Sequence, residues 1–120
     1  MSKAYELGLQ KATFEANTDL SDYQYHGVVM NTSEKVALAS AGVKILGILQ
    51  DTPDAANRPC IVAYGGISKA MGGAAIEEGH EVEVDSSGHF VTRVAGVSVG
   101  TAAVPCGGSG QLFSILFNAT

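Results

Sequence analysis

The sequence lacks the features that mark several common functional classes. Only seven lysines and arginines are present, set singly from Lys3 to Arg93, and the net charge is −5. With no basic stripe to neutralise phosphates, we expect no nucleic-acid partner. No apolar run approaches the roughly 20 residues that cross a bilayer, and the first residues lack a hydrophobic signal core. We therefore expect no membrane association and a protein made in a cytoplasm.

Metal-binding and redox motifs are also missing. Cys60 and Cys106 lie far apart and match neither a zinc nor a CxxC spacing, so we expect two free buried thiols. His26, His80 and His89 are dispersed and form no HxH or HExxH motif, and we expect them on the surface. We predict no metal ion and no cofactor.

No catalytic or phosphate-binding motif stands out either. The sequence contains no GxSxG elbow, no GxxxxGK[ST] loop and no GxGxxG that opens a helix. The glycine pairs at 65, 72 and 107 are typical of turns. A site assembled from dispersed residues stays open, with serines, Cys60 or the carboxylates of residues 77 to 85 as its candidates. We predict that the chain is not an enzyme.

What the sequence does contain favours a folded β protein that meets a partner. Hydrophobic residues make up 46% of the chain, mean hydropathy is +0.18 and there are fifteen glycines. Excess apolar surface of this kind is buried either in a lean sheet core or against another molecule. Oligomerisation or docking is therefore expected.

Short apolar stretches, each ended by Gly, Asn, Asp, Ser or Pro, recur without a helical period, which predicts an all-β fold. We expect a small, compact β-barrel or β-sandwich-like domain with short strands and long glycine-rich loops. At most one helical turn is expected between Ala70 and Glu78. The predicted strands are Ala12 to Ala16, Gly27 to Met30, Lys35 to Leu38, Val43 to Leu49, Cys60 to Tyr64, Gly66 to Ala70, Glu81 to Asp85, Phe90 to Val94 and Gln111 to Phe117.

Residues 81 to 94 carry the clearest local signal. The run EVEVD alternates acids with valines, so Val82 and Val84 face one side and three carboxylates face the other. The turn residues DSSG follow, and alternation resumes at Phe90, which predicts a hairpin. Glu77 and Glu78 extend the acidic cluster formed by Glu81, Glu83 and Asp85. We interpret it as a solvated face that blocks aggregation, with a metal or partner contact as the alternative.

Other segments predict breaks in the sheet. Gly47, inside an apolar stretch, indicates a bulge or a close backbone approach, and Gly65 with Gly66 indicates a sharp corner between two strands. The strands around Gly47 and at the C-terminal end are apolar on both faces, which suits central or interfacial strands. Three segments are predicted to be irregular: Asn17 to Asp22, Asp51 to Pro59 and Val99 to Gly110.

The first residues have two interpretations. Residues 1 to 22 form either an extended N-terminal arm, which adds a strand to a neighbouring sheet edge, or the first strand of the domain's own sheet. Residues 23 to 120 form the β domain, with no further domain boundary.

The order of these features resembles the capsid cement or decoration proteins of tailed phages. The likeness runs over residues 27 to 117. Its parts are a strand ending in LGIL at 46 to 49, the segment from Cys60 to Lys69 through two glycines, the hairpin AAIEEGHEVEVDSSG at 74 to 88, the stretch GVSVGTA at 96 to 102 and a closing strand GQLFSILF at 110 to 117.

This resemblance implies a structural virion protein on the capsid exterior, present in the host cytoplasm during assembly. It implies binding to the major capsid protein, bridging of its subunits to stabilise the expanded head, and self-association as a homotrimer in preference to a dimer. The candidate capsid or oligomer contacts are the large apolar residues of the N-terminal segment and the last strand: Tyr5, Leu7, Leu9, Phe14, Leu20, Phe113 and Phe117.

One alternative of a different class remains. Tyr23, Tyr25 and Tyr64, together with exposed loops, are compatible with a virion module that binds a host surface or a carbohydrate.

Overall fold

The computed structural model describes residues 4–118, which contain nine strands and no helix. The predicted all-β class is confirmed. The radius of gyration, 12.9 Å, is close to the roughly 14 Å expected of a compact chain of this length. The strands are β1 (Leu7–Glu15), β2 (Gly27–Met30), β3 (Val36–Leu38), β4 (Gly47–Leu49), β5 (Pro59–Met71), β6 (Glu81–Val84), β7 (Phe90–Thr92), β8 (Gly100–Val104) and β9 (Leu112–Phe117).

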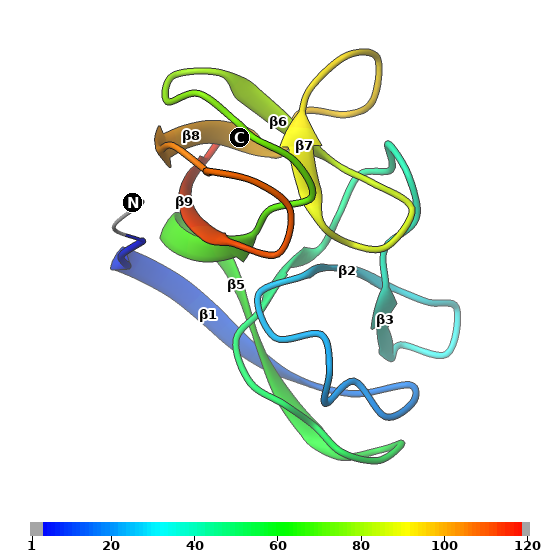
Figure 1. Cartoon of the computed structure of the whole chain (residues 1–120). Helices are drawn as coiled ribbons and strands as arrows, with labels where there is room; N and C mark the ends of the chain where they lie inside the picture. Colours follow the sequence, from blue (N-terminus) through cyan, green and yellow to red (C-terminus); the bar gives the residue numbers. More distant parts are fainter. Residues whose placement is uncertain (1–3, 119–120) are drawn as a thin grey trace.

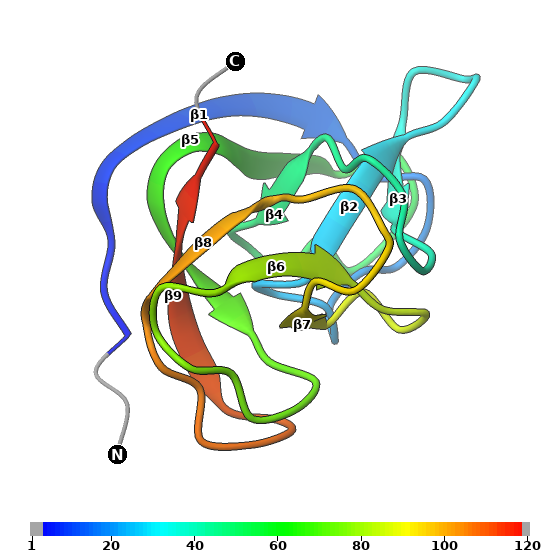
Figure 2. The same ribbon diagram turned by 90° about the horizontal axis from the view of Figure 1, so that it is seen from above.

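The long strand β5 organises the sheet. The strand order is β3-β2-β4-β5-β9-β8-β6-β7, with β1 paired to β5. Ala63 pairs with both β1 and β4, and Ile67 pairs with both β1 and β9. A residue pairs with one strand on each edge, so β1 follows one edge of β5 while β4 and then β9 follow the other. The sheet curls around this strand into a half-barrel (Figures 1 and 2).

Two clusters of buried hydrophobic residues form the core of the curled sheet. Strand β4 contributes to both, because Ile48 faces the larger cluster and Leu49 the smaller. Isolated bridges bring Ala16, just after β1, to Val36 of β3, and Gly72, just after β5, to Phe90 of β7. The larger cluster is Ala39, Ile48, Ala70, Ile76, Val82, Val84, Phe90, Val99, Ala102, Cys106, Phe113 and Ile115, and the smaller is Ala16, Leu20, Val28, Val36, Leu49, Cys60 and Val62.

The predicted corner at Gly65 and Gly66 is wrong, because β5 continues through both glycines. Gly66 has φ +85°, and a Cβ there would lie 2.3 Å from the carbonyl oxygen of Gly8. The pairing of β1 with β5 shifts register at this point. Glycine therefore makes an irregularity within one strand instead of a break between two.

Strand β4 lies unusually close to β5. A Cβ on Gly47 would lie 2.1 Å from the carbonyl oxygen of Ala63, so the predicted close backbone approach is confirmed. All three residues of β4 are buried. The close approach lets this short strand lie between the two clusters.

Between residues 70 and 110 one expectation agrees with the structure and one is wrong. Residues 70 to 78, where at most one helical turn was expected, contain none; after β5 ends they form bends, bridges and a turn. Residues 100 to 104 were predicted to be irregular but form β8, which pairs with β6 and β9. The small residues of β8 have a low intrinsic preference for strands, and the segment forms a strand because it hydrogen-bonds to a neighbouring strand on each side.

The hairpin of β6 and β7 is confirmed. Val82 pairs with Thr92 and Val84 pairs with Phe90. Both valines are completely buried, whereas Glu81 is exposed. Strand β7 ends at Thr92, two residues earlier than predicted, because the backbone of Val94 turns back to the Glu83 carboxylate.

In the N-terminal segment, residues 7 to 15 form β1, which pairs with β5 of the same sheet. Tyr5 continues this attachment: its amide donates to Ser114 Oγ at 2.6 Å, and that hydroxyl donates back to the Tyr5 carbonyl at 2.8 Å. Residues 5 to 15 are therefore bound to this chain's own sheet. The predicted arm also included residues 1–3, which lie outside the described residues.

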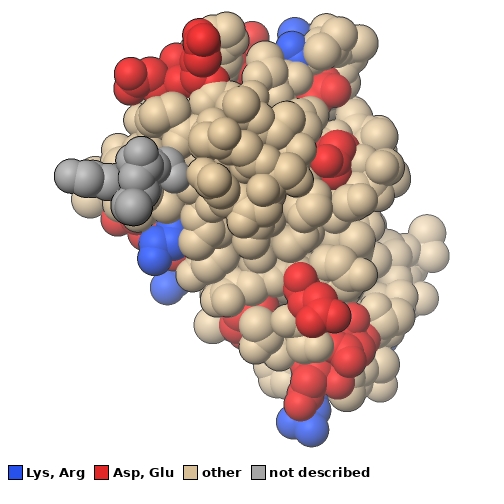
Figure 3. Space-filling model, in the orientation of Figure 1, with Lys and Arg blue, Asp and Glu red and all other residues tan. Residues whose placement is uncertain are grey.

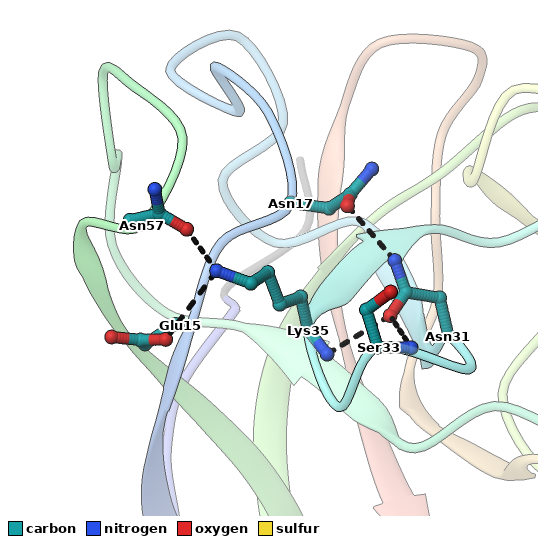
Figure 4. Close-up of polar contacts among 6 residues, drawn as sticks. All are labelled: Glu15, Asn17, Asn31, Ser33, Lys35 and Asn57. Carbon is teal, nitrogen blue, oxygen red and sulfur yellow. Dashed lines mark hydrogen bonds and ion pairs between the residues drawn. The ribbon is translucent and has the colours of Figure 1, made fainter.

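Polar contacts fix the far end of β1 (Figure 4). The Lys35 ammonium lies 3.5 Å from the Glu15 carboxylate and donates to Asn57 Oδ1. Asn31 Nδ2 donates to Asn17 Oδ1 at 2.9 Å, while Asn31 Oδ1 accepts from the amide of Ser33. These contacts attach the turn between β2 and β3 to the segment that leaves β1.

Candidate functional site

The cysteines have the environment of structural thiols. Both are free and buried, as predicted. Burial, with a smaller contribution from the Asp51 carboxylate, raises the pKa of Cys60 to about 11. Since the thiolate is the nucleophile, this thiol is unreactive near neutral pH. The Cys106 thiol lies in the larger cluster and contacts the carbonyl oxygen of Gly108 at 3.2 Å.

The acidic cluster divides into two parts. Glu77, Glu78 and Glu81 are exposed. Glu83 accepts hydrogen bonds from the amides of Gly96 at 2.6 Å and Val94 at 3.2 Å, and these bonds lower its pKa.

Asp85, the remaining member, accepts hydrogen bonds from two amides of the following turn. The interpretation as a uniformly solvated face is therefore wrong for Glu83 and Asp85, which organise backbone. No group of three His, Cys, Asp or Glu side chains within residues 4–118 is placed to hold a metal ion.

The histidines differ from one another. His80 is exposed, with half of its side-chain surface accessible, as predicted. His26 is 5% exposed, which corrects the expectation that it lies on the surface. Its ring centroid lies 4.6 Å from that of His89, which comes from the turn between β6 and β7. The sequence separates these two residues, and only the pairing of distant segments reveals the contact.

The candidate contact residues do not share one surface. Leu20 and Phe113 are buried in the core, at 2% and 0% exposure, so their side chains cannot meet a partner of the folded chain. Leu9, Phe14 and Phe117 are partly buried, and the last two pack against the clusters. The exposed candidates are Tyr5 and Leu7, at 40% and 65% exposure.

The exposed candidates belong to an apolar row that the register assembles. Leu7 of β1 pairs with Ile67 of β5, and Ile67 pairs with Leu116 of β9. Side chains directly opposite one another in paired strands lie on the same face, about 5 Å apart. Leu116 is 49% exposed, and Tyr5 is bonded to Ser114, two residues before it. We call Tyr5, Leu7, Ile67 and Leu116 the outer apolar row.

The sequence prediction missed Ile67 and Leu116. Alternation along β9 places Phe113 and Ile115 in the core and Leu116 on the opposite face. The period was readable in the sequence, but the face that meets the core was not. Ile67 required the register between three strands that are distant along the chain.

The last part of the chain is free of charge. No Lys, Arg, Asp or Glu occurs from Val94 to Asn118, a segment that includes β8 and β9. Figure 3 shows a broad central area without charged side chains, while acidic groups gather toward the margins. A partner that docks on this segment would remove water from few charged groups. The centres of protein interfaces are likewise poor in charged residues.

A groove of about 600 Å³ lies where β4 and β9 diverge along β5. Tyr64, 49% exposed, is one of its walls, and Lys44 is the charged residue in its lining. Tyr23 and Tyr25 are partly buried and pack against different clusters, so the three tyrosines form no common platform. The full lining is Gln10, Lys44, Ile45, Leu46, Tyr64, Val97, Ser98, Val99, Phe117 and Asn118.

Comparison with known proteins identifies a shared fold. No protein-family model matches the chain, and no curated protein matches its sequence. Among solved structures, the crystal structure of the head fiber gp8.5 N base of bacteriophage phi29 superposes with a TM-score of 0.75, covering 92% of this chain and 94% of that chain at 14% sequence identity. The chain therefore has the same fold as the base of a phage head fiber.

Proposed function

We propose that this chain is a structural subunit of a phage virion that attaches to the exterior of the head. The observation that carries the proposal is the fold it shares, over nearly its whole length, with a head fiber base. The resemblance of residues 27 to 117 to the capsid cement or decoration proteins of tailed phages supports the same assignment. The reactivity of the candidate groups agrees with it, since Cys60 is a protonated, buried thiol and two of the acidic side chains bind backbone amides.

We further propose that attachment stabilises the expanded head by bridging major capsid protein subunits. The outer apolar row, which includes Tyr5 and Leu7, is the surface we assign to this contact, and the rest of β9, which has no charged side chain, extends it. Several copies on one lattice would engage adjacent subunits, so that modest individual contacts combine. We propose a homotrimer, with a dimer as the alternative, as the unit that attaches.

A binding assay tests the contact. Purified chain is mixed with expanded heads of its phage that lack it, and bound protein is measured by sedimentation and gel densitometry. The wild-type chain is expected to saturate at a stoichiometry fixed by the lattice and to raise the temperature at which heads release DNA. The Leu116→Lys variant is expected to bind at least about tenfold more weakly, because it places a charge at the centre of the contact.

Val94→Lys is the matched control. Val94 is 85% exposed but lies outside the outer apolar row, so this variant should bind as the wild type does. Failure of the wild-type chain to bind any such head would overturn the proposed function. Equal loss in both lysine variants would remove the row as the contact, and binding without a change in DNA release would remove the bridging role.

A second function is supported by the groove beside Tyr64. An exposed aromatic ring next to amide side chains is a common arrangement for holding a sugar, and Gln10 and Asn118 line the same groove. A virion module that binds host-surface carbohydrate would use this site. Glycan-array binding by the wild-type chain, lost in Tyr64→Ala and kept in Tyr5→Ala, is the expected result. An array without binding would exclude this function.

A further inference from the structure

A contact between two imidazole rings joins two distant parts of the fold; His26 is buried and His89 is partly buried. His26 immediately precedes β2, and His89 ends the turn between β6 and β7. Their ring centroids are 4.6 Å apart and the rings are tilted by 42°. One backbone hydrogen bond crosses the same boundary, from the amide of Gly27 to the carbonyl oxygen of Gly88 at 2.8 Å. The contact holds the tip of the β6–β7 hairpin against the start of β2.

Burial favours the neutral form of His26, while its hydrogen bond to the Gln24 carbonyl favours the charged form. Its Nδ1 lies 3.0 Å from the carbonyl oxygen of Gln24, which can only accept, so Nδ1 carries a proton and donates it. The edge of the ring meets Tyr23 at a centroid distance of 5.3 Å. Tyr25, with φ +66°, occupies the left-handed region just before His26. A bulky residue rarely adopts this conformation, and here it directs the chain beneath the hairpin turn.

His89 lies beside a carboxylate, with its Nδ1 3.9 Å from Asp85 Oδ2. The other oxygen of Asp85 accepts from the amides of Ser87 and His89, so the carboxylate is fixed in the turn. Among residues 4–118, the titratable groups that face His26 from the packed segments are Tyr23, His89 and Asp85.

We propose that the His26–His89 contact is a pH-sensitive latch, which holds the β6–β7 turn on β2 while His26 is neutral and releases it when His26 takes up a proton. A protonated His26 would be buried against a second imidazole ring, and Asp85, the one carboxylate that faces it among residues 4–118, lies beside His89. Release of the turn would expose Phe90, which follows His89 and is completely buried in the closed form. This inference concerns the fold itself and does not depend on the proposed attachment to a head.

The direction of the pH effect follows from His26. Burial, opposed by the bond to Gln24 and reinforced by the charge of His89, lowers its pKa below the ordinary value of 6.5. An opened or unfolded His26 therefore takes up a proton at a higher pH than the closed one does. The latch contributes its full stability above about pH 6.5 and loses it progressively as the pH falls below that value.

Amide hydrogen exchange tests the latch in the full chain. Protection of residues 84 to 90, corrected for intrinsic exchange, is expected to fall several-fold from pH 7.5 to 5.5, while the β1-paired part of β5 keeps its protection. In His26→Asn the side-chain amide keeps a donor for the Gln24 carbonyl but cannot titrate. The pH dependence of residues 84 to 90 should disappear in this variant. His80→Asn, the same change at an exposed histidine, should retain it.

A second measurement uses the wild-type chain alone, in case His26→Asn does not fold. The imidazole NMR titration of His26 is followed, and its midpoint is expected below the ordinary value of 6.5. A midpoint at or above 6.5, a loss of protection that is equal in β5 and the hairpin, or an unchanged pH dependence in folded His26→Asn would each overturn the latch.

Discussion

Replacing Phe113 with alanine is expected to lower the free energy of unfolding by about 3 to 5 kcal/mol, the range found when a buried phenylalanine is truncated. Phe113 is completely buried in the larger cluster, and its cross-strand partner on β5 is Ala70, which is too small to fill the cavity. For a domain of this size the loss is a large part of the total stability. Urea unfolding followed by circular dichroism measures the difference.

Phe117→Ala is the control for this prediction. Phe117 has the same side chain on the same strand, but it is only partly buried, so truncation removes fewer contacts and leaves a cavity open to water. Its loss should be no more than about half that of Phe113→Ala. Equal losses, or a loss below about 1 kcal/mol for Phe113→Ala, would contradict the assignment of Phe113 to the core.

Adding a single methyl group at Gly47 is expected to be nearly as damaging. In Gly47→Ala the new Cβ would lie 2.1 Å from the carbonyl oxygen of Ala63 and 2.7 Å from Val62. The first of these is backbone and cannot rotate away, so β4 must move from β5. We expect a loss of about 3 kcal/mol or more, measured by urea unfolding, with increased exchange at the amides of β4.

Gly108→Ala makes the same change where there is room. Apart from its two neighbours in the chain, no residue lies within 4 Å of a Cβ at Gly108, so the stability of the Gly108→Ala protein should stay within about 0.5 kcal/mol of the wild type. A Gly47→Ala protein as stable as Gly108→Ala would show that β4 and β5 are not in such close contact.

Local sequence signals predicted the elements whose side chains alternate. The acids and valines of residues 81 to 85 alternate, which indicates a strand, and the valines mark the face of that strand that is buried. The hairpin could therefore be predicted. The same logic failed for β8, whose residues Gly100 to Val104 are mostly small and are followed by a proline. Strand β8 forms because it pairs with β6 and β9. The sequence of the segment alone does not predict this pairing.

The surfaces were harder to predict than the strands. Phe113 and Leu116 are similarly apolar, yet one is in the core and the other is exposed, because only the packing decides which face of β9 turns inward. The outer apolar row further requires the register of β1, β5 and β9. The contact of His26 with His89 depends on a turn docking against a distant strand, which leaves no local pattern in the sequence.

The central position of β5 also determines the order in which the chain can fold. Its partners begin at Leu7 and end at Phe117, so the second edge of β5 stays incomplete until the last strand has been synthesised. Contacts this distant in sequence close slowly, on a timescale of roughly milliseconds to seconds. A ribosome-bound chain without β9 would expose the row of unpaired amides and carbonyls that Ile67 to Met71 normally share with it. We therefore expect this edge of β5 to complete its pairing only after β9 has left the ribosome, with chaperone binding concentrated on β5 until then.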